Sequence, residues 1–143
     1  DLERFATYTA APSAIFKDGI PLGHLATLKE VPQFTYPEIV NEIKRVDIVW
    51  FNLKGLMFPK RVFEVVDSIG TLSDALNRSS QLMAFNVDFF ILGRKEYSSK
   101  FEQKVGLEPY INFRDKYKFR SYDDIINYYE NAVAYNAARK GFI

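Results

Sequence analysis

Two strongly apolar stretches of this chain, residues 46–52 and 61–68, each carry an acidic residue in their interior. The first reads Val-Asp-Ile-Val-Trp-Phe-Asn and the second reads Arg-Val-Phe-Glu-Val-Val-Asp-Ser, which places these acids at Asp47 and Glu64. β-Branched and aromatic residues dominate both stretches, and this composition predicts two β-strands. Burial of an unpaired carboxylate is costly, so each acid needs either a partner or a function.

Helical and strand patterns alternate along most of the chain. Apolar residues three and four apart predict helices over residues 37–45, 71–85, 98–105 and 121–140. Strands are predicted over residues 46–52, about 60–67 and 88–93, the last short and apolar enough to be a buried, parallel strand. Residues 112–120 alternate aromatic and charged side chains, which indicates an edge strand or an extended loop. This order predicts an α/β domain with a small mixed sheet flanked by helices.

Residues at the ends of the predicted helices match the preferences of helix termini. Pro37 takes a first helical position, and Thr71-Leu-Ser-Asp74 resembles a capping box. Ser121 precedes the longest helix, which Gly141 is expected to close. We expect one stripe of this last helix to face inward, made of Ile125, Ile126, Tyr129, Ala132, Val133 and Ala137.

The first 34 residues differ from the rest, because three prolines and two glycines interrupt their apolar positions. We expect an irregular entry segment over 1–34, with a short helix around residues 13–16. His24 lies in this segment, and we interpret it as a hydrogen-bonded surface histidine, since no second histidine or cysteine supports a catalytic role.

The composition argues against several kinds of functional site but does not distinguish between classes of binding partner. A chain of 143 residues is the size of one globular domain, and its formal net charge of +1 favours no partner class. The absence of cysteine and the single histidine argue against disulfides, a thiol nucleophile and a zinc centre. No apolar run is long enough to span a membrane, and the first residues do not resemble a signal peptide, so we expect a cytoplasmic protein. A start at Asp1 suggests a fragment of a longer chain whose other domains are potential partners.

Two acids on adjacent strands can share a divalent cation, which can orient water and offset charge at a phosphodiester. Strand alternation places Glu64 on one face with Lys60, Val62 and Val66. Spacing alone also allows an acid that projects into solvent or pairs with a lysine or arginine.

At these residues the chain resembles the PD-(D/E)XK nuclease superfamily, especially a restriction-endonuclease-like subgroup. The order of a glutamate-bearing helix, a strand with Asp47, a strand with Glu64 and a further helix resembles the αβββαβ core of that family. The subgroup's second strand reads Phe-Glu-Val, then Glu or Lys, then His or Asp and Ser or Thr, with an arginine in the next helix. In this chain the matching residues are Phe63-Glu64-Val65, Asp67-Ser68 and Arg78. The resemblance covers about residues 35–95.

The resemblance implies a metal-dependent DNA endonuclease of a restriction, defence or DNA-processing system, which can act as a homodimer. Asp47 and Glu64 would bind Mg²⁺ or Mn²⁺, with Glu38 or Glu42 completing the metal shell. Contacts to DNA phosphates would come from basic residues beside this site, which are Lys54, Lys60, Arg61, Arg78, Arg114, Lys116, Lys118 and Arg120.

The chain departs from the family pattern at Val66, where the family has lysine or a second glutamate. Valine cannot hold a metal or activate water, and Lys60 is four residues away, about 13 Å along a strand. Three hypotheses follow: an endonuclease with an unusual third catalytic group, a non-enzymatic DNA-binding or scaffolding module of the same fold, or a protein-interaction domain that uses its aromatic surface.

Overall fold

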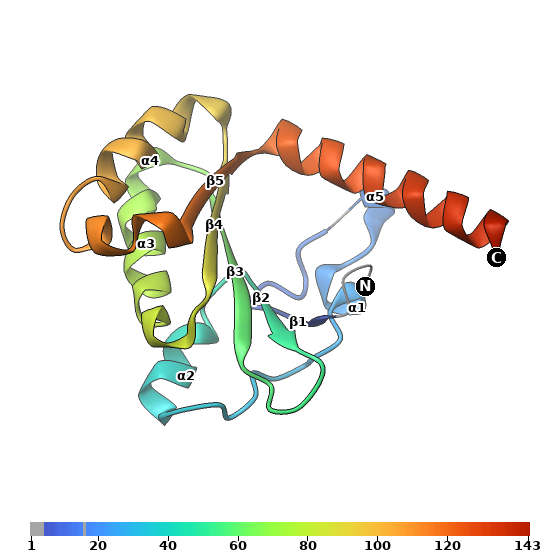
Figure 1. Cartoon of the computed structure of the whole chain (residues 1–143), viewed down its shortest axis with the longest axis horizontal. Coiled ribbons are helices and arrows are strands. Elements are labelled where there is room, and N and C mark those ends of the chain that lie inside the picture. Colours follow the sequence, from blue (N-terminus) through green and yellow to red (C-terminus); the bar gives the residue numbers. More distant parts are fainter. Residues whose placement is uncertain (1–4, 16) are drawn as a thin grey trace.

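The computed structural model describes residues 5–15 and 17–143, and within them the chain forms a five-stranded mixed sheet (Figure 1). The strands lie in chain order across the sheet, with β1–β2 and β2–β3 antiparallel and β3–β4 and β4–β5 parallel. Their bounds are β1 (Phe5–Thr9), β2 (Ile48–Asn52), β3 (Pro59–Val66), β4 (Asp88–Gly93) and β5 (Tyr117–Ser121). The predicted α/β class with a mixed sheet is confirmed.

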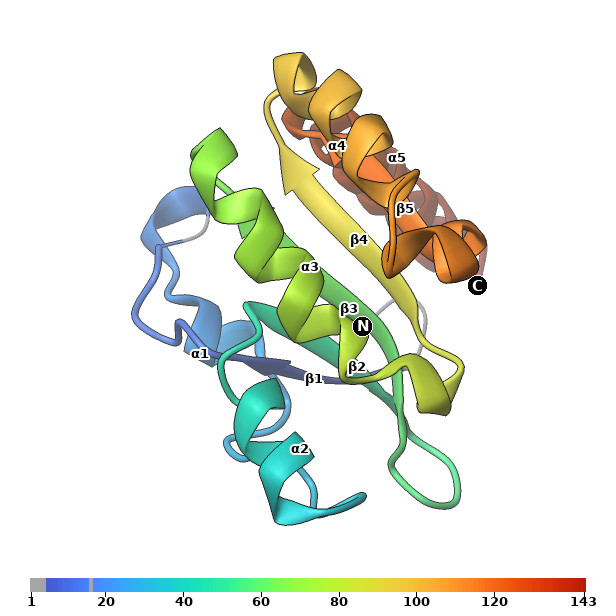
Figure 2. The same ribbon diagram turned by 90° about the vertical axis from the view of Figure 1, so that its left-hand side faces the viewer.

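Three helices cover one face of this sheet, as the two perpendicular views in Figures 1 and 2 show. They are α2 (Pro37–Ile43), α3 (Leu72–Ser80) and α4 (Ser98–Val105). The short α1 (Leu22–Leu25) and the long α5 (Tyr122–Phe142) lie on the other side. No helix in the described parts of the chain has the length and apolar character needed to cross a membrane. Single-turn or irregular 3-10 segments occur at Lys17–Gly19, Ile69–Thr71, Met83–Phe85, Lys95–Tyr97 and Tyr110–Lys116.

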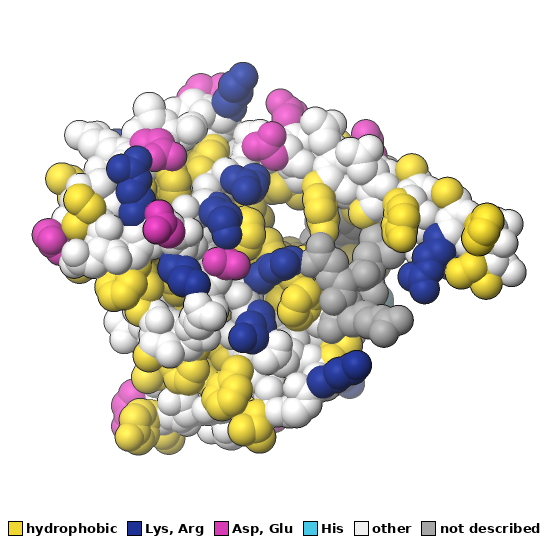
Figure 3. Space-filling model, viewed as in Figure 1, with side chains coloured by type: hydrophobic (Ala, Val, Ile, Leu, Met, Phe, Trp, Pro, Cys, Tyr) yellow, Lys and Arg dark blue, Asp and Glu magenta, His cyan; other side chains and the backbone are white. Residues whose placement is uncertain are grey.

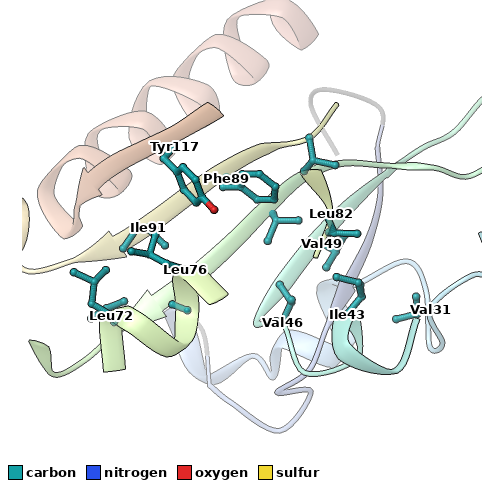
Figure 4. Close-up of a cluster of buried hydrophobic side chains, with 14 of the residues drawn as sticks. Val31, Ile43, Val46, Val49, Leu72, Leu76, Leu82, Phe89, Ile91 and Tyr117 are labelled. Atoms are coloured by element: carbon teal, nitrogen blue, oxygen red, sulfur yellow. The ribbon is translucent and has the colours of Figure 1, made fainter. Parts of the chain in front are cut away.

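The hydrophobic core lies between the helix-covered face of the sheet and these helices (Figure 4). Val49, Phe89 and Ile91 point from the strands toward Leu72 and Leu76 of α3, and all five are at most 1% exposed. In β3 the buried residues alternate with less buried ones from Val62 to Val66, because successive strand side chains point to opposite faces. This alternation confirms the predicted face assignment of β3.

The connection between β3 and β4 places α3 across the sheet. Parallel neighbours cannot be joined by a tight turn, so the chain crosses the face of the sheet through a helix. The order α2, β2, β3, α3, β4 follows the predicted order, but the third antiparallel strand, β1, precedes α2 instead of following it.

The prediction of an irregular segment over residues 1–34 missed β1. Phe5–Thr9 pairs antiparallel with β2 and turns Ala6 toward the core, which follows the two-residue period of a strand. The predicted short helix at 13–16 is absent from the described residues 13–15, and its last residue lies outside the described part. The helical turns occur later, at Lys17–Gly19 and Leu22–Leu25.

Two predictions about helix ends were also wrong. Thr71 makes no capping bond, because a 3-10 turn precedes α3 and already gives Thr71 a helical backbone (φ −91°, ψ −5°). The capping box is instead at the start of α5, where Ser121 and Asp124 exchange side-chain and backbone hydrogen bonds. The predicted helix over 71–85 ends at Ser80, ahead of Asn86, whose φ of 54° is left-handed.

The C-terminal third of the chain departs further from prediction. An edge strand or an extended loop was predicted over 112–120, but Tyr110–Lys116 is a 3-10 segment and the strand β5 begins only at Tyr117. The apolar stripe of α5 was predicted to face inward, but no described residue of this helix is buried, and Ile126 and Val133 are 52% and 47% exposed. The helix leaves the end of β5 and extends away from the sheet (Figure 1).

We predict that Leu76→Ala lowers the free energy of unfolding by about 2–5 kcal/mol, because it opens a cavity under α3. Leu76 is completely buried, whereas Leu56 in the β2–β3 loop is 74% exposed. The same substitution at Leu56 should therefore change stability by less than about 0.5 kcal/mol. Urea denaturation of both variants measures the difference, and equal losses would contradict the core described above.

Candidate functional site

Asp47 and Glu64 lie opposite each other on the helix-covered face of the sheet. The antiparallel register pairs Ile48 with Phe63 and Val49 with Val62, and one further step brings Asp47 against Glu64. Directly opposed residues have Cβ atoms about 4.5–5.5 Å apart. The Oδ2 atom of Asp47 also accepts a hydrogen bond from the backbone N–H of Val65 at 2.7 Å, which fixes its carboxylate at the edge of β3.

Helix α3 supplies a guanidinium that binds Glu64 in a bidentate pair. The Nε atom of Arg78 lies 2.9 Å from Oε1 of Glu64, and its Nη2 atom lies 3.1 Å from Oε2. The Glu64 side chain is 1% exposed and that of Arg78 is 25% exposed. Both oxygens of the buried carboxylate therefore accept a charge-assisted hydrogen bond from one arginine.

Burial raises the pKa of Glu64 to about 7, an effect that the hydrogen bonds from Arg78 partly offset and that the charge of Asp47 increases. The pKa of Arg78 is raised in turn, chiefly by its hydrogen bonds to Glu64. Two carboxylates and one guanidinium thus share this site, and the positive charge beside the acids comes from the protein itself.

Val66 is the residue at which the sequence departs from the pattern expected from the nuclease resemblance. It lies two residues after Glu64 on the same face of β3 and is 1% exposed, within the hydrophobic core. Lys60 is near the other end of the strand, about 13 Å from Glu64 by strand rise. No charged side chain of β3 therefore replaces the missing group beside Glu64.

The residues present do not fit a magnesium site. Mg²⁺ requires oxygen ligands in near-octahedral geometry, but both Glu64 oxygens face the Arg78 guanidinium and one Asp47 oxygen faces a backbone N–H. Glu38 and Glu42 lie on α2, and in residues 5–15 and 17–143 no three acidic or histidine residues are grouped so that they could hold a metal ion.

The predicted phosphate-binding residues do not form one cluster around this site. Lys54 is exposed in the β2–β3 loop, and Lys116 in the 3-10 segment reaches the side chain of Asn86. Arg61 and Lys118 project from the other face of the sheet, away from Glu64. Of the other predicted contacts, Lys60 lies near the start of β3, Arg114 pairs with Glu102, Arg120 donates a hydrogen bond to the carbonyl of Phe119, and Arg78 is the partner of Glu64.

From the sequence, Arg78 was predicted to contact DNA, and its pairing with Glu64 was not foreseen. A helical signal was present, because Arg78 follows the buried Ala75 by three residues and therefore lies on the sheet-facing side of α3. His24 is exposed and lines a cavity of about 670 Å³ beside β1 and α1. Ala10, which also lines this cavity, donates a backbone hydrogen bond to the carbonyl oxygen of Asp47.

The description of this site rests on contacts within the chain itself. Comparisons with protein-family models, curated proteins and solved structures give no match. The geometry shows a pair of opposed carboxylates next to an apolar side chain, and one of these carboxylates is paired with the partly buried Arg78.

We predict that Arg78→Ala costs about 3–5 kcal/mol of stability at pH 8, because it leaves Glu64 buried without a partner. The loss should be smaller at pH 5. A raised folded-state pKa means that Glu64 contributes its stability below its unfolded pKa, and this contribution is lost as pH rises through about 7. At pH 5 Glu64 is mostly protonated in the folded state and needs the guanidinium less. Urea denaturation at both pH values measures the difference.

A matched control is Arg114→Ala, which removes the arginine of an exposed pair with Glu102. Side chains in that pair are 54% and 55% exposed, so its loss should cost under about 1 kcal/mol at either pH. An Arg78→Ala cost that does not change with pH would contradict the raised pKa of Glu64.

Proposed function

We propose that this chain is a nuclease-like domain that binds nucleic acid without cleaving it. The observation that carries the proposal is the bidentate Arg78–Glu64 pair beside the buried Val66. Of the three hypotheses from the sequence, this arrangement best supports the non-enzymatic module.

The pair argues against hydrolysis for an electrostatic reason. Two-carboxylate nuclease chemistry needs ionised oxygens that hold a cation, which then offsets charge on the phosphodiester. Glu64 has a pKa raised to about 7, and the charge it does carry is met by Arg78. A cation entering the site would be repelled by the guanidinium and would have to displace two hydrogen bonds.

The lack of a lysine or glutamate at position 66 also argues against hydrolysis. Valine at position 66 offers neither a proton nor a lone pair to an attacking water. A lysine placed there without local repacking would add a charge inside the core, because Val66 is 1% exposed.

The nuclease-like fold rests on the resemblance together with the order of elements. The order α2, β2, β3, α3, β4 agrees with the helix, strand, strand, helix, strand order of the family that the chain resembles. Glu64 lies on β3, and Asp47 directly precedes the neighbouring strand β2. β1, which precedes α2, is the point of difference. Nucleic acid as the ligand is supported by that resemblance and by basic side chains on the surface, among them Lys54, Arg61 and Lys118.

An active metal-dependent endonuclease is the second candidate, and the opposition of Asp47 and Glu64 favours it. In that case a conformational change that separates Arg78 from Glu64 would have to precede metal binding. The two candidates differ in one observable, which is cleavage.

We predict that the purified chain does not nick supercoiled plasmid in the presence of Mg²⁺ or Mn²⁺. Asp47→Ala is the control, because a contaminating nuclease cuts equally with either protein. Cutting by the parent that disappears in Asp47→Ala would contradict the proposal and favour the second candidate. Nicking that appears only in Val66→Lys would identify position 66 as the site of inactivation.

A further inference from the structure

The cavity of about 670 Å³ beside the end of β1 is lined by neither Glu64 nor Arg78, and the proposed function does not use it. Its walls come from the end of β1, residues 12–13, α1 with the proline before it, and residues 26–29. In both Figure 1 and Figure 2, α1 lies next to β1. Sites for small molecules typically have volumes of about 300–1,000 Å³, so this cavity is large enough to enclose one.

Backbone hydrogen bonds join the walls of this cavity to one another. The N–H groups of Leu22 and Gly23 in α1 donate to the carbonyl oxygens of Ala14 and Pro12, at 2.8 and 2.9 Å. The N–H groups of residues 27 and 28 donate to the carbonyl oxygen of Thr7 in β1, at 3.1 and 2.9 Å. The chain's own contacts therefore form the cavity, as is usual for small-molecule sites.

Gly23 allows α1 to approach Pro12 closely. A Cβ atom at position 23 would lie 2.9 Å from the Cβ of Pro12 and 3.1 Å from its carbonyl oxygen. Any residue with a side chain would therefore push these two walls apart, and glycine is the residue that permits the contact.

Much of the cavity lining is apolar. Leu28, two prolines and two alanines line it together with Tyr8. The hydroxyl of Tyr8 donates a hydrogen bond to the backbone carbonyl oxygen of Lys44 at 3.0 Å, so the polar end of this side chain already has a partner. A lining of this kind suits a ligand with a hydrocarbon or aromatic body.

The polar part of the lining favours negative charge. His24 and Lys29 both line the cavity and are exposed, and none of the described residues that line it is acidic. In residues 5–15 and 17–143, neither cationic side chain forms an ion pair with an acid. The hydroxyl of Ser13 adds a further hydrogen-bond donor. An anionic group is the ligand that these donors complement.

We propose that this cavity binds a small organic anion. Its carboxylate, phosphate or sulfonate group lies at Lys29 and His24, and its apolar body lies against Leu28 and the prolines. The inference goes beyond the proposed binding of nucleic acid and does not depend on it.

Charge and volume together select this class of ligand. A cation would find no acidic side chain among the described residues of the lining and would be repelled by Lys29. A neutral molecule would fill the apolar part of the cavity but would form no charge-assisted hydrogen bond. A nucleic-acid strand or a folded protein would place only a small part of itself in a cavity of this volume, so the ligand is a single small molecule.

Two dyes that share one ring system test the requirement for an anion. Anilinonaphthalene sulfonate carries a sulfonate group, and N-phenylnaphthylamine is the same ring system without it. Both emit more strongly in an apolar site, so fluorescence titration gives both affinities. We predict that the sulfonate dye binds roughly tenfold more tightly, because it alone forms charge-assisted hydrogen bonds. Lys29→Ala should remove most of this preference by weakening the sulfonate dye alone. Lys54→Ala is the matched control, since Lys54 is an exposed lysine outside the cavity.

The position of the bound dye needs a second measurement, because hydrophobic side chains are also exposed along α5 (Figure 3). Tyr135 and Phe142 of that helix are 68% and 93% exposed. His24 is the only histidine of the chain, so the C–H signals of its imidazole are unambiguous in an NMR spectrum. We predict that the sulfonate dye shifts these signals, and that the shift follows the same binding curve as the emission.

A larger side chain in the lining tests the cavity itself. Ala26→Phe takes up space that the ligand needs and should weaken both dyes by about tenfold. Ala134→Phe is the matched control, because Ala134 is exposed on α5 and outside the cavity, and it should weaken neither dye.

Three outcomes would overturn the proposal. Equal affinities for the two dyes would rule out the anionic ligand. His24 signals that do not move at saturating sulfonate dye, or binding that Ala26→Phe leaves unchanged, would rule out the cavity as the site. Circular dichroism and urea midpoints establish that the variants remain folded, and Lys29→Ala with the His24 signals keeps the test valid if Ala26→Phe is unstable. All of these results are independent of plasmid cleavage, which tests the proposed function separately.

Discussion

The buried ion pair between Arg78 and Glu64 is the contact on which the rest of this structure depends. It joins the middle strand of the sheet to the helix that crosses from β3 to β4, and it provides the hydrogen bonds without which a carboxylate could not occupy the core. The same contact determines the chemistry of the neighbourhood. A carboxylate whose two oxygens are bound by one guanidinium is poorly suited to hold a metal ion.

The two faces of the sheet consequently differ in chemistry. On the helix-covered face, the carboxylates of Asp47 and Glu64 lie together beside the apolar Val66. On the opposite face, strand alternation projects aromatic rings and cations from the same strands. The two sets of side chains project from the same strands to opposite faces of the sheet.

Much of the central fold follows from local sequence patterns. The alternation in β3, the apolar run of β4 and the bounds of α4 were all predictable, because each depends on burial of nearby residues in a regular period. β1 was missed because its pairing with β2 joins segments about forty residues apart. The inward-facing stripe of α5 was mispredicted because its apolar pattern resembles that of a buried helix, and only tertiary structure reveals that none of its described residues is buried. At the site, the acids were identified from the sequence, but the Arg78 contact depends on how α3 lies across the sheet.

The most direct test of this account is whether the carboxylate pair binds a divalent cation. Mn²⁺ added to the isotopically labelled protein broadens the NMR signals of amides near any site it occupies. The account predicts no selective broadening at the amides of Asp47 and Val65 at stoichiometric Mn²⁺, because Arg78 already occupies Glu64. Selective loss of those signals in the parent protein would show that the carboxylates remain available to a metal, and would contradict the central claim.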